Sequence, residues 1–360
     1  MTEERLRELR NSIKETDRKI VRLLNQRAGM SLEIGRIKAE LGMEIYDPSQ
    51  ESGIYKNVVE ANGLDLPSKS LRAIFREILS ASRMLQSPVT VAYFGLEASF
   101  THIAAQSHFG TSSQYFSHPT IASVFDDVEK GRVKWGVVPV ENSLEGSVNL
   151  ALDRLITTTL NIRAEIFLRI THCLLSLHER MEDIKKIYSH PQPLAQCQGW
   201  LRANIPNAVI IEMESTTAAA QRVAEEGKGA AIGSRAAAGT YGLDILSEGI
   251  EDKASNTTRF LVIGEGEGKA TGRDKTSLLF ATPDLPGALY NALQPFAERR
   301  INMMKIESYP VKDRLWEYLF FVDVAGYEKD EEIVQCLDNL RRRTAFLKIL
   351  GSYPRCEDVL

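Results

Sequence analysis

The sequence predicts three regions of different fold class: an all-α module, a two-lobed α/β region and a small α+β domain. Apolar residues recur at helical spacing over residues 1–87, and strand and helix signals alternate over residues 89–265. Residues 275–355 show a βαββαβ order, which is ferredoxin-like. A chain of 360 residues is also too long for one typical domain.

The composition is that of an ordinary globular protein and excludes several classes. Hydrophobic residues make up 43% of the chain and charged residues 26%, enough to build buried cores. The net charge of -4 gives no reason to expect a nucleic-acid or anionic-membrane partner. No apolar run reaches the length of a membrane span, and the N-terminus MTEERLRELR is unlike a signal peptide, so we expect a cytoplasmic protein. The scattered cysteines and histidines predict reduced thiols, no metal site and no cofactor.

The N-terminal stretch from Thr2 to Leu41 predicts one long helix, which Gly42 ends. Its apolar residues follow a 3-4 heptad spacing at Leu6, Leu9, Ile13, Ile20, Leu23, Met30, Ile34, Ile37 and Leu41. A helix of about forty residues is roughly 60 Å long, too long to fold back on one small domain. The apolar seam is therefore expected to pair with a second chain, giving a homodimer or a higher homo-oligomer.

Arg27 interrupts this seam, where a charge is costly without a partner. Arg10 and Lys38 lie on the same helical face, but Arg10 is about 25 Å from Arg27 along the axis. An antiparallel partner helix would bring its own Arg10 beside Arg27 and Lys38 and form a cationic pocket. The alternative is that all three are solvated cations at the edge of the seam.

Two further helices complete the first module, one capped by Asp47 or Ser49 and one carrying Leu71 to Leu79. This module resembles the intertwined-dimer chorismate mutase domain. The residues at that family's active-site positions are Arg10, Arg27, Lys38, Asp47, Glu51, Ser82 and Gln86.

The resemblance implies a pericyclic rearrangement of chorismate to prephenate without a covalent or acid–base step. Arg27 and the second copy's Arg10 would hold the two carboxylates, and Glu51 with the backbone near Asp47 would hold the ring hydroxyl. Lys38 and Gln86 would stabilise charge on the breaking ether oxygen. Gln50 stands where the family often has arginine, which leaves a non-catalytic dimerising module as an alternative.

The middle region is organised around the stretch VVPVENSLEGSV, residues 137–148. Its β-branched start predicts a buried strand, which breaks at Glu141-Asn142-Ser143 and resumes as a helix through Ile156. A strand that ends in Asn, Ser and Gly and feeds a helix presents free backbone N–H groups to an anion. An ordinary capped strand–helix turn is the equal alternative.

Other polar clusters follow strands of the same region, whose alternation with helices predicts parallel sheets. Ser189-His190-Pro191-Gln192 begins a helix and suits an anion, whereas Ser215-Thr216-Thr217 is typical of a plain N-cap. In Asn256-Thr257-Thr258-Arg259-Phe260, an arginine beside hydroxyls suits a carboxylate, although an arginine at a strand edge is often merely solvated.

Together these motifs resemble the prephenate dehydratase family over nearly the whole region. The matching stretches are VVPVENSLEGSV, THCLL, YSHPQPLAQC, GSRAAAGTYGL and NTTRF. The resemblance implies a fold like periplasmic binding proteins, with prephenate in a cleft and loss of carbon dioxide and the ring hydroxyl to give phenylpyruvate. Thr258 would deliver the proton or strong hydrogen bond that the leaving hydroxide needs, and Arg259, the second implied catalytic residue, would hold a carboxylate or a hydroxyl of the substrate. The implied substrate contacts are Glu141, Asn142, Ser143, Ser189, His190, Gln192, Ser215, Thr216 and Phe260.

One corner departs from the dehydratase pattern. Leu96 and Ala98 replace a proline and a glycine of the family's first motif, so a positive φ at position 98 would strain the backbone. Residues 264–272 contain a GxGxG echo, but no helix signal follows, so we interpret this stretch as a flexible linker.

The C-terminal region, with its βαββαβ order, resembles the ACT regulatory domain. Two of its strands are expected at Asn302–Val311 and Trp316–Val324. The residues that match its phenylalanine-binding motifs are Gly287, Ala288, Leu289, Glu307 and Ser308. The resemblance implies L-phenylalanine as an effector, but Tyr309 replaces the arginine of the family's ESRP motif. A domain that only supports oligomerisation is the alternative.

The leading hypothesis is a bifunctional enzyme of L-phenylalanine biosynthesis that converts chorismate to prephenate and then to phenylpyruvate, with feedback by phenylalanine. A small-molecule sensor without turnover is the alternative from another class, disfavoured by Thr258-Arg259-Phe260 and by the absence of a DNA-binding helix. The sequence leaves open whether arogenate is accepted, whether prephenate passes directly between the sites, and whether the oligomer is a dimer or a tetramer.

Overall fold

The computed structural model describes residues 2–63, 66–253, 255–310, 318–356 and 359–360. The chain divides into two compact units. The first comprises Met1–Asp47, Gly53–Val89 and Phe109–Gln114, and the second comprises Pro48–Ser52, Thr90–His108 and Tyr115–Leu360. Helices dominate the first unit, and the second contains three β-sheets.

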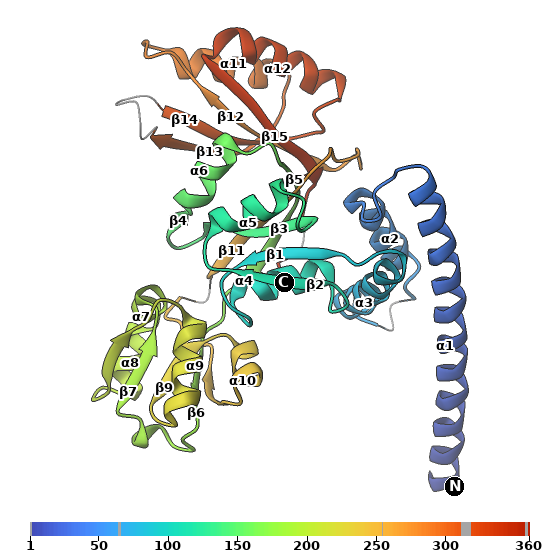
Figure 1. The fold of residues 1–360 in the computed structure, drawn as a ribbon, viewed down its shortest axis with the longest axis vertical. Coiled ribbons are helices and arrows are strands. Elements are labelled where there is room, and N and C mark those ends of the chain that lie inside the picture. Colours follow the sequence, from blue (N-terminus) through green and yellow to red (C-terminus); the bar gives the residue numbers. More distant parts are fainter. Residues whose placement is uncertain (1, 64–65, 254, 311–317, 357–358) are drawn as a thin grey trace. The chain divides into compact units, whose positions relative to one another are not determined.

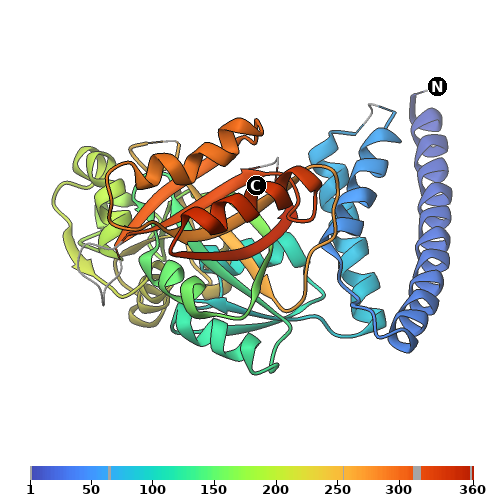
Figure 2. The same cartoon turned by 90° about the horizontal axis from the view of Figure 1, so that it is seen from above.

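The predicted long helix is confirmed as α1, and two shorter helices follow it. Their bounds are α1 Thr2–Glu40, α2 Pro48–Glu60 and α3 Ser68–Gln86. Both views draw α1 as one unbroken helix (Figures 1 and 2). Its seam is open in the single chain, since Ile13 is 60% exposed and Leu23 is 64% exposed. Despite its length, neither α1 nor any other described helix is long and apolar enough to cross a membrane.

The first sheet of the second unit is mixed rather than parallel. Its strands are β1 Thr90–Phe94, β2 Gln114–His118, β3 Trp135–Asn142, β4 Gly146–Ser147, β5 Asn161–Arg169 and β11 Thr257–Gly264. Helices α4 Phe100–Phe109, α5 Ile121–Glu129 and α6 Asn149–Thr157 connect them. The order is β2-β1-β3-β11-β5, with β4 paired to β3. β1 and β3 run parallel, but β11 returns from a distant part of the chain and runs antiparallel to both β3 and β5.

The second sheet is also mixed, so the expectation of parallel sheets is wrong for both. Its strands are β6 Cys173–Ser176, β7 Lys186–Ser189, β8 Val209–Glu212, β9 Ala230–Gly233 and β10 Asp244–Glu248, in the order β10-β6-β9-β7-β8. The 3-10 turn Met181–Asp183 and helices α7 Pro191–Gln196, α8 Gln198–Asn204, α9 Thr216–Glu226 and α10 Arg235–Tyr241 join them. β7 runs parallel to β8 and β9, whereas β6 runs antiparallel to β9 and β10. β10 was not predicted from the sequence, because it is a half-exposed edge strand with few β-branched residues.

The third sheet confirms the predicted βαββαβ order. Its elements are β12 Asp274–Ala281, α11 Ala288–Glu298, β13 Met303–Pro310, β14 Tyr318–Ala325, α12 Glu331–Arg343 and β15 Phe346–Pro354. The strand order is β13-β14-β12-β15, antiparallel throughout. Both helices cover one face of this sheet, where Phe280, Phe296 and Leu337 form a core (Figure 1). Positions 311 and 316–317 of the expected strands lie outside the described residues.

The opposite face of the third sheet packs on the first sheet. Phe321 and Tyr353 from the third sheet share one buried cluster with Leu155 of α6 and Leu261 of β11. The two sheets therefore have a common hydrophobic core, which places charged residues of this interface out of water.

The strand and the helix predicted around residues 137–156 are confirmed as β3 and α6, but a hairpin lies between them. β3 runs on to Asn142, turns through Gly146, whose φ is 81°, and returns as β4, with Asn142 opposite Gly146. Only then does α6 begin, at Asn149. The free N–H groups of that helix therefore do not follow Asn142 directly, and a β-hairpin presents the motif instead.

Candidate active sites

A network of amide and hydroxyl groups lies at the adjacent ends of β3 and β11. Asn142 Nδ2 donates to Thr258 Oγ1 at 2.9 Å and to Asn256 Oδ1 at 2.8 Å. Thr258 is 9% exposed and Asn256 is 1% exposed. Thr258 Oγ1 accepts this hydrogen bond from Asn142 and donates none to the described residues. Its own O–H therefore remains available to donate. The structure thus brings together two of the predicted site residues, Asn142 and Thr258.

The same network extends to the second sheet. Asn256 Nδ2 donates to Gln196 Oε1 at 2.9 Å, and Gln196 Nε2 donates to Glu145 Oε1 at 2.9 Å. His172 Nε2 lies 2.9 Å from the same Gln196 oxygen. Burial lowers the pKa of His172, so the neutral imidazole is favoured and Nε2–H is the donor. Through Asn256, these residues hold the side-chain amide of Asn142 in one orientation.

Four residues of this network were not predicted as site residues from the sequence, although they lie in the motifs quoted above: Glu145, His172, Gln196 and Asn256. Each lies in a different motif or loop, in ENSLEGS, THCLL, YSHPQPLAQC and NTTRF, respectively. Their common feature is a polar side chain at or near one end of a strand or helix. That signal was present, but only the folded chain shows that the four converge.

Several predicted substrate contacts use their side chains to hold the backbone. Ser143 Oγ donates to Ser255 O and accepts from Thr257 N, which locks the hairpin onto β11. Ser189 Oγ donates to Ile232 O at 2.9 Å and is fully buried. His190 and Ser215 are the N-caps of α7 and α9, accepting from Gln192 N and Ala218 N. The hydroxyl of Ser215 therefore acts as a plain N-cap, as the alternative interpretation expected.

The remaining predicted contacts have different environments. Gln192 and Thr216 are half-buried near the starts of α7 and α9. Phe260 is 1% exposed, two residues beyond Thr258 on the same strand. Side chains alternate along a strand, so Phe260 shares a face of β11 with Thr258.

Arg259 and Glu141 do not join the Thr258 network. Arg259 is 3% exposed, and its guanidinium forms ion pairs with Glu165 and Asp323. Glu141 Oε2 lies 2.7 Å from the Nζ of Lys305 on β13. This placement gives no support to a contact between Arg259 and a substrate carboxylate.

Ala98 does adopt the positive φ that the altered first motif suggested, at 64°. Its N–H donates to His102 Nδ1 and its carbonyl accepts from Ser234 Oγ. The methyl group is buried among the residues of the second sheet's core, which offsets part of the cost of this conformation.

A second group of predicted residues lies along α1 and α3. Arg27 Nη1 donates to Ser82 Oγ at 2.5 Å, and Lys38 Nζ donates to Ile45 O at 2.9 Å. Gly35 approaches Gln86 so closely that a Cβ there would lie 2.7 Å from its Cγ. The Gln86 Oε1 atom is buried and has no hydrogen-bond partner among the described residues. Cationic groups and an unused amide oxygen are thus placed along one side of α1.

The other chorismate positions are not assembled within one unit. Arg10 is exposed on the distal part of α1. Asp47 belongs to the first unit and Glu51 to the second, and both are half-buried. The predicted contact of Arg10 with the site requires a second copy of the chain and stays a prediction.

The predicted effector residues lie at the start of α11 and on β13. Gly287, with φ of 78°, precedes α11, whose first residues are Ala288 and Leu289. Glu307 and Ser308 lie on β13, where Lys305 Nζ approaches Glu307 Oε2 at 2.9 Å.

Tyr309, which replaces the expected arginine, is buried. Its hydroxyl donates to Asp153 of α6, and its ring joins the core shared by the first and third sheets. Tyr309 therefore fixes β13 to α6, a role that needs no bound effector.

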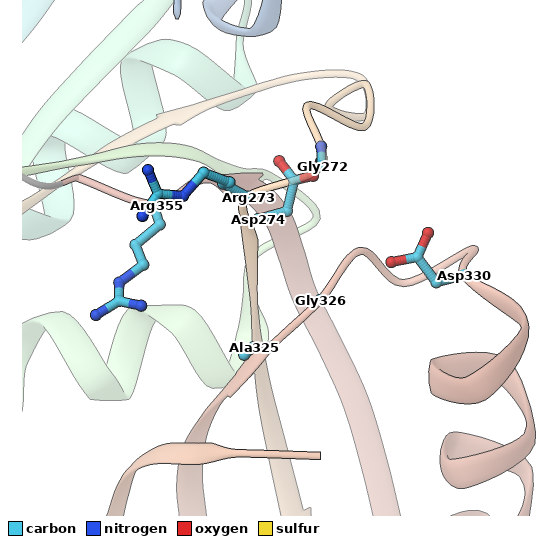
Figure 3. A pocket seen from close by; sticks show the side chains of 7 residues that line it. All are labelled: Gly272, Arg273, Asp274, Ala325, Gly326, Asp330 and Arg355. Carbon is cyan, nitrogen blue, oxygen red and sulfur yellow. Dashed lines mark hydrogen bonds between the residues drawn. The ribbon is translucent and has the colours of Figure 1, made fainter. Parts of the chain in front are cut away.

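A pocket of about 220 Å³ lies at one end of the third sheet and includes none of the predicted site residues. Its acidic groups are held by nearby loops, since Asp274 accepts from Thr271 N and Asp330 accepts from Tyr327 N. Arg273 and Arg355 lie on one side of β12 and Asp330 on the other (Figure 3). Among the residues in the described ranges, no group of three or more His, Cys, Asp or Glu side chains could hold a metal ion.

Three family models match the chain in succession. They are chorismate mutase type II at residues 9–87, prephenate dehydratase at residues 91–268 and ACT domain at residues 276–342. The bifunctional chorismate mutase/prephenate dehydratase of Aquifex aeolicus is 44% identical over 98% of this chain and 98% of its own length. The enzyme of the same description from Neisseria gonorrhoeae is 44% identical over 96% of each chain.

This chain belongs to the bifunctional chorismate mutase/prephenate dehydratase family. The prephenate dehydratase of Arthrobacter aurescens, solved in complex with L-Phe, has 33% identity and a TM-score of 0.69, covering 74% of this chain and 90% of that one. The first unit therefore contains most of the mutase module, the first two sheets belong to the dehydratase region, and the third sheet belongs to the ACT domain.

Proposed function

We propose that the chain catalyses two consecutive steps of L-phenylalanine biosynthesis, chorismate to prephenate and prephenate to phenylpyruvate. The contact of Asn142 with Thr258 carries the dehydratase assignment, because it sets a hydroxyl donor at the place where two family motifs meet. Full-length similarity to bifunctional relatives supports the pairing of the two activities.

In the dehydratase step, the bond from the ring to its carboxylate breaks and carbon dioxide leaves. The released electron pair makes the ring aromatic, and the ring hydroxyl leaves with a proton as water. Hydroxide is a poor leaving group, so a positioned donor must supply a proton or a strong hydrogen bond. Thr258 is suited to this because Asn142 occupies an acceptor site on its oxygen and directs the O–H elsewhere.

The amide network keeps that donor preorganised. Asn142 is held by Asn256, which is held in turn by Gln196. A neutral His172 donates to the same Gln196 oxygen, so the direction of each hydrogen bond is fixed along the chain. Preorganised polar groups lower a barrier because they need not reorient as charge moves.

In the mutase step, no group of the protein has to form a bond with the substrate. Chorismate carries two carboxylates, and Arg27 with Arg10 of a second copy would hold them in a reactive geometry. The exposed apolar seam of α1 supports a homodimer as the active form. The buried, unpaired Gln86 oxygen and the Lys38 ammonium lie on α3 and α1 as the proposed charge-stabilising groups.

Phenylalanine is the proposed effector of the ACT domain. A similar dehydratase was solved with L-Phe, and the matching residues Gly287 and Glu307 are present here. Lys305 links this region to the dehydratase because its ammonium group forms ion pairs with both Glu307 and Glu141. Glu141 directly precedes Asn142 in the sequence. Three of the four cysteines, Cys173, Cys197 and Cys336, are buried and unbonded, which suits the reducing cytoplasm proposed as the location of the protein.

Product formation from chorismate by the purified chain tests the proposal. The wild type should release phenylpyruvate, and Thr258→Val should accumulate prephenate because the mutase remains active. Thr257→Val is the matched control, since it removes a neighbouring hydroxyl from the other face of β11. If the chain converts prephenate but not chorismate, the helical module serves only dimerisation. If it converts neither, the sensor hypothesis is favoured.

A further inference from the structure

The side chain that follows Thr258 enters a buried cluster of charges behind β11. Arg259 Nε lies 3.0 Å from Glu165 Oε2, its Nη1 lies 2.7 Å from Asp323 Oδ2, and its Nη2 donates to Tyr353 Oη at 2.9 Å. The Arg259 side chain is 4% exposed, and those of Glu165 and Asp323 are at most 1% exposed. Three nitrogens of one guanidinium thus meet three different protein partners.

A second cation completes the cluster. Lys275 Nζ lies 2.7 Å from Glu165 Oε2 and 3.8 Å from Asp323 Oδ2, so two cations face two anions. Burial alone would lower the pKa of Arg259, but Tyr353, Asp323 and Glu165 together raise it above its ordinary value. Burial and the charge of Asp323 raise the pKa of Tyr353 well above its ordinary value, so the phenol keeps its proton.

The cluster is divided between two domains. Glu165 and Arg259 come from β5 and β11 of the dehydratase, whereas Lys275, Asp323 and Tyr353 come from β12, β14 and β15 of the ACT sheet. Two of the three partners of Arg259 therefore belong to the ACT domain. The contacts are specific hydrogen bonds and ion pairs in a dry interface, where an unpaired charge is costly.

The geometry of β11 relates this cluster to the reacting group. β11 is regular at this point, because the bulge in its ladder with β3 lies on β3, between Pro139 and Glu141. Thr258 and Arg259 are consecutive residues of this regular strand, so a displacement of the backbone at Arg259 also displaces Thr258, although the two side chains point to opposite faces. The hydrogen bond from Asn142 to Thr258 has little tolerance for such a shift.

We propose that Arg259 is a positioning residue for Thr258 and that Asp323 and Tyr353 of the ACT domain complete this support. The inference rests on the proposed dehydratase activity and deepens it. Arg259 holds β11 on the face opposite to Thr258 and touches no substrate atom. The dehydratase site therefore depends on side chains of the ACT domain.

Three substitutions test the inference in the full-length chain. Asp323→Leu removes an acceptor without a large change in size, Tyr353→Phe removes one hydroxyl without changing any charge, and Arg259→Lys keeps the charge but loses the threefold contact. Each should lower the dehydratase kcat, by roughly 10- to 100-fold for Asp323→Leu, because small misplacements of a reacting group carry that cost. KM for prephenate should change by less than kcat, and mutase activity in the same chain should stay unchanged.

Two further variants separate positioning from folding. Asp338→Leu removes an exposed carboxylate of α12, paired with Arg341 at 3.4 Å, and should leave both activities unchanged. Asp323→Leu combined with Lys275→Met restores charge balance in the cluster. This double variant should recover thermal stability but not kcat, since Arg259 still lacks one acceptor; recovery of both would overturn the positioning role.

Hydrogen exchange gives a readout that does not depend on turnover. Peptides that cover residues 256–264 should exchange faster in Asp323→Leu than in the wild type, while peptides of α1 should not. A wild type without dehydratase activity would refute the proposed function, yet this exchange comparison would still test the link. The inference is overturned if Asp323→Leu leaves both exchange and kcat unchanged, or if Arg259→Lys raises KM for prephenate at constant kcat, as a direct carboxylate contact would require.

Discussion

Replacement of Lys305 by methionine should separate effector binding from effector inhibition. Lys305 Nζ lies 2.7 Å from Glu141 Oε2 and 2.9 Å from Glu307 Oε2, and its side chain is 14% exposed. Glu141 precedes Asn142 of the dehydratase network, and Glu307 belongs to the matched effector motif. One ammonium group thus joins the two sites by ion pairs.

The magnitude follows from this geometry. The glutamates are 35% and 26% exposed, so solvent screens both pairs, and each contributes about 1 kcal/mol. Loss of the link should therefore remove roughly 1–2 kcal/mol of coupling, which corresponds to about a 5- to 30-fold change. We expect the half-inhibitory phenylalanine concentration to rise by that factor in Lys305→Met.

Binding should move in the other direction. Without Lys305, Glu307 has lost its cation and is a better partner for the ammonium group of an amino acid. Calorimetric titration should therefore show phenylalanine bound at least as tightly as by the wild type, although inhibition is weaker. Lys329→Met, which removes an exposed cation paired with Glu267, is the matched control and should change neither quantity.

The reasoning is refuted if binding and inhibition weaken together in Lys305→Met, because Lys305 would then only shape the effector site. A wild type that neither binds phenylalanine nor is inhibited by it would instead show that the ACT domain serves oligomerisation. In that case the burial of Tyr309 against α6 would be its main contribution.

Three further outcomes are expected. Thr258→Val should lower dehydratase kcat by roughly 10²- to 10⁴-fold, measured as phenylpyruvate release, with mutase activity intact. Gly35→Ala should lower mutase kcat about tenfold or more by displacing Gln86, whereas Gly29→Ala, with nothing within 4 Å of its Cβ, should not. His172 has a lowered pKa in the folded chain, so its contribution to stability is full above pH 6.5 and is lost as pH falls below that value. Urea unfolding of His172→Gln should therefore show a smaller loss of stability between pH 7 and pH 5.5, by up to about 1.4 kcal/mol per pH unit.

Each of these three predictions has a contrary result. Unchanged kcat in Thr258→Val would assign the proton to another donor, and equal mutase rates in both glycine variants would place Gln86 outside the site. Equal pH dependence of unfolding in the wild type and His172→Gln would mean that the pKa of this imidazole is not lowered in the folded chain.

Local signals in the sequence were sufficient for α1 and for the βαββαβ order. The seam of α1 repeats over many turns, and each helix and strand of the ACT domain has its own periodicity. Such patterns depend on neighbours in the chain, which the sequence displays directly. The three domain types followed from them together with the quoted motifs.

Long-range pairing was not visible in the same way. A hairpin in which Asn142 pairs with Gly146 separates the predicted strand from the predicted helix, and the first sheet is mixed because β11 returns from more than a hundred residues away. Neither choice leaves a clear mark on local composition. The convergence of Asn256 and Gln196 on Asn142 depends on those same pairings, so the full network could not be derived before the fold.

The case of Arg259 shows which part of this could have been predicted. In the strand that contains Thr258, Arg259 and Phe260, a period of two places the first and third side chains on one face and the second on the other. Two neighbours on a regular strand rarely reach the same small ligand, so the motif alone argued against a shared substrate contact for Thr258 and Arg259. The motif could not predict which part of the chain packs on the Arg259 side of β11. Because that part is the ACT sheet, with Asp323 and Tyr353 at the required positions, one short motif serves the proposed chemistry on one face and domain attachment on the other.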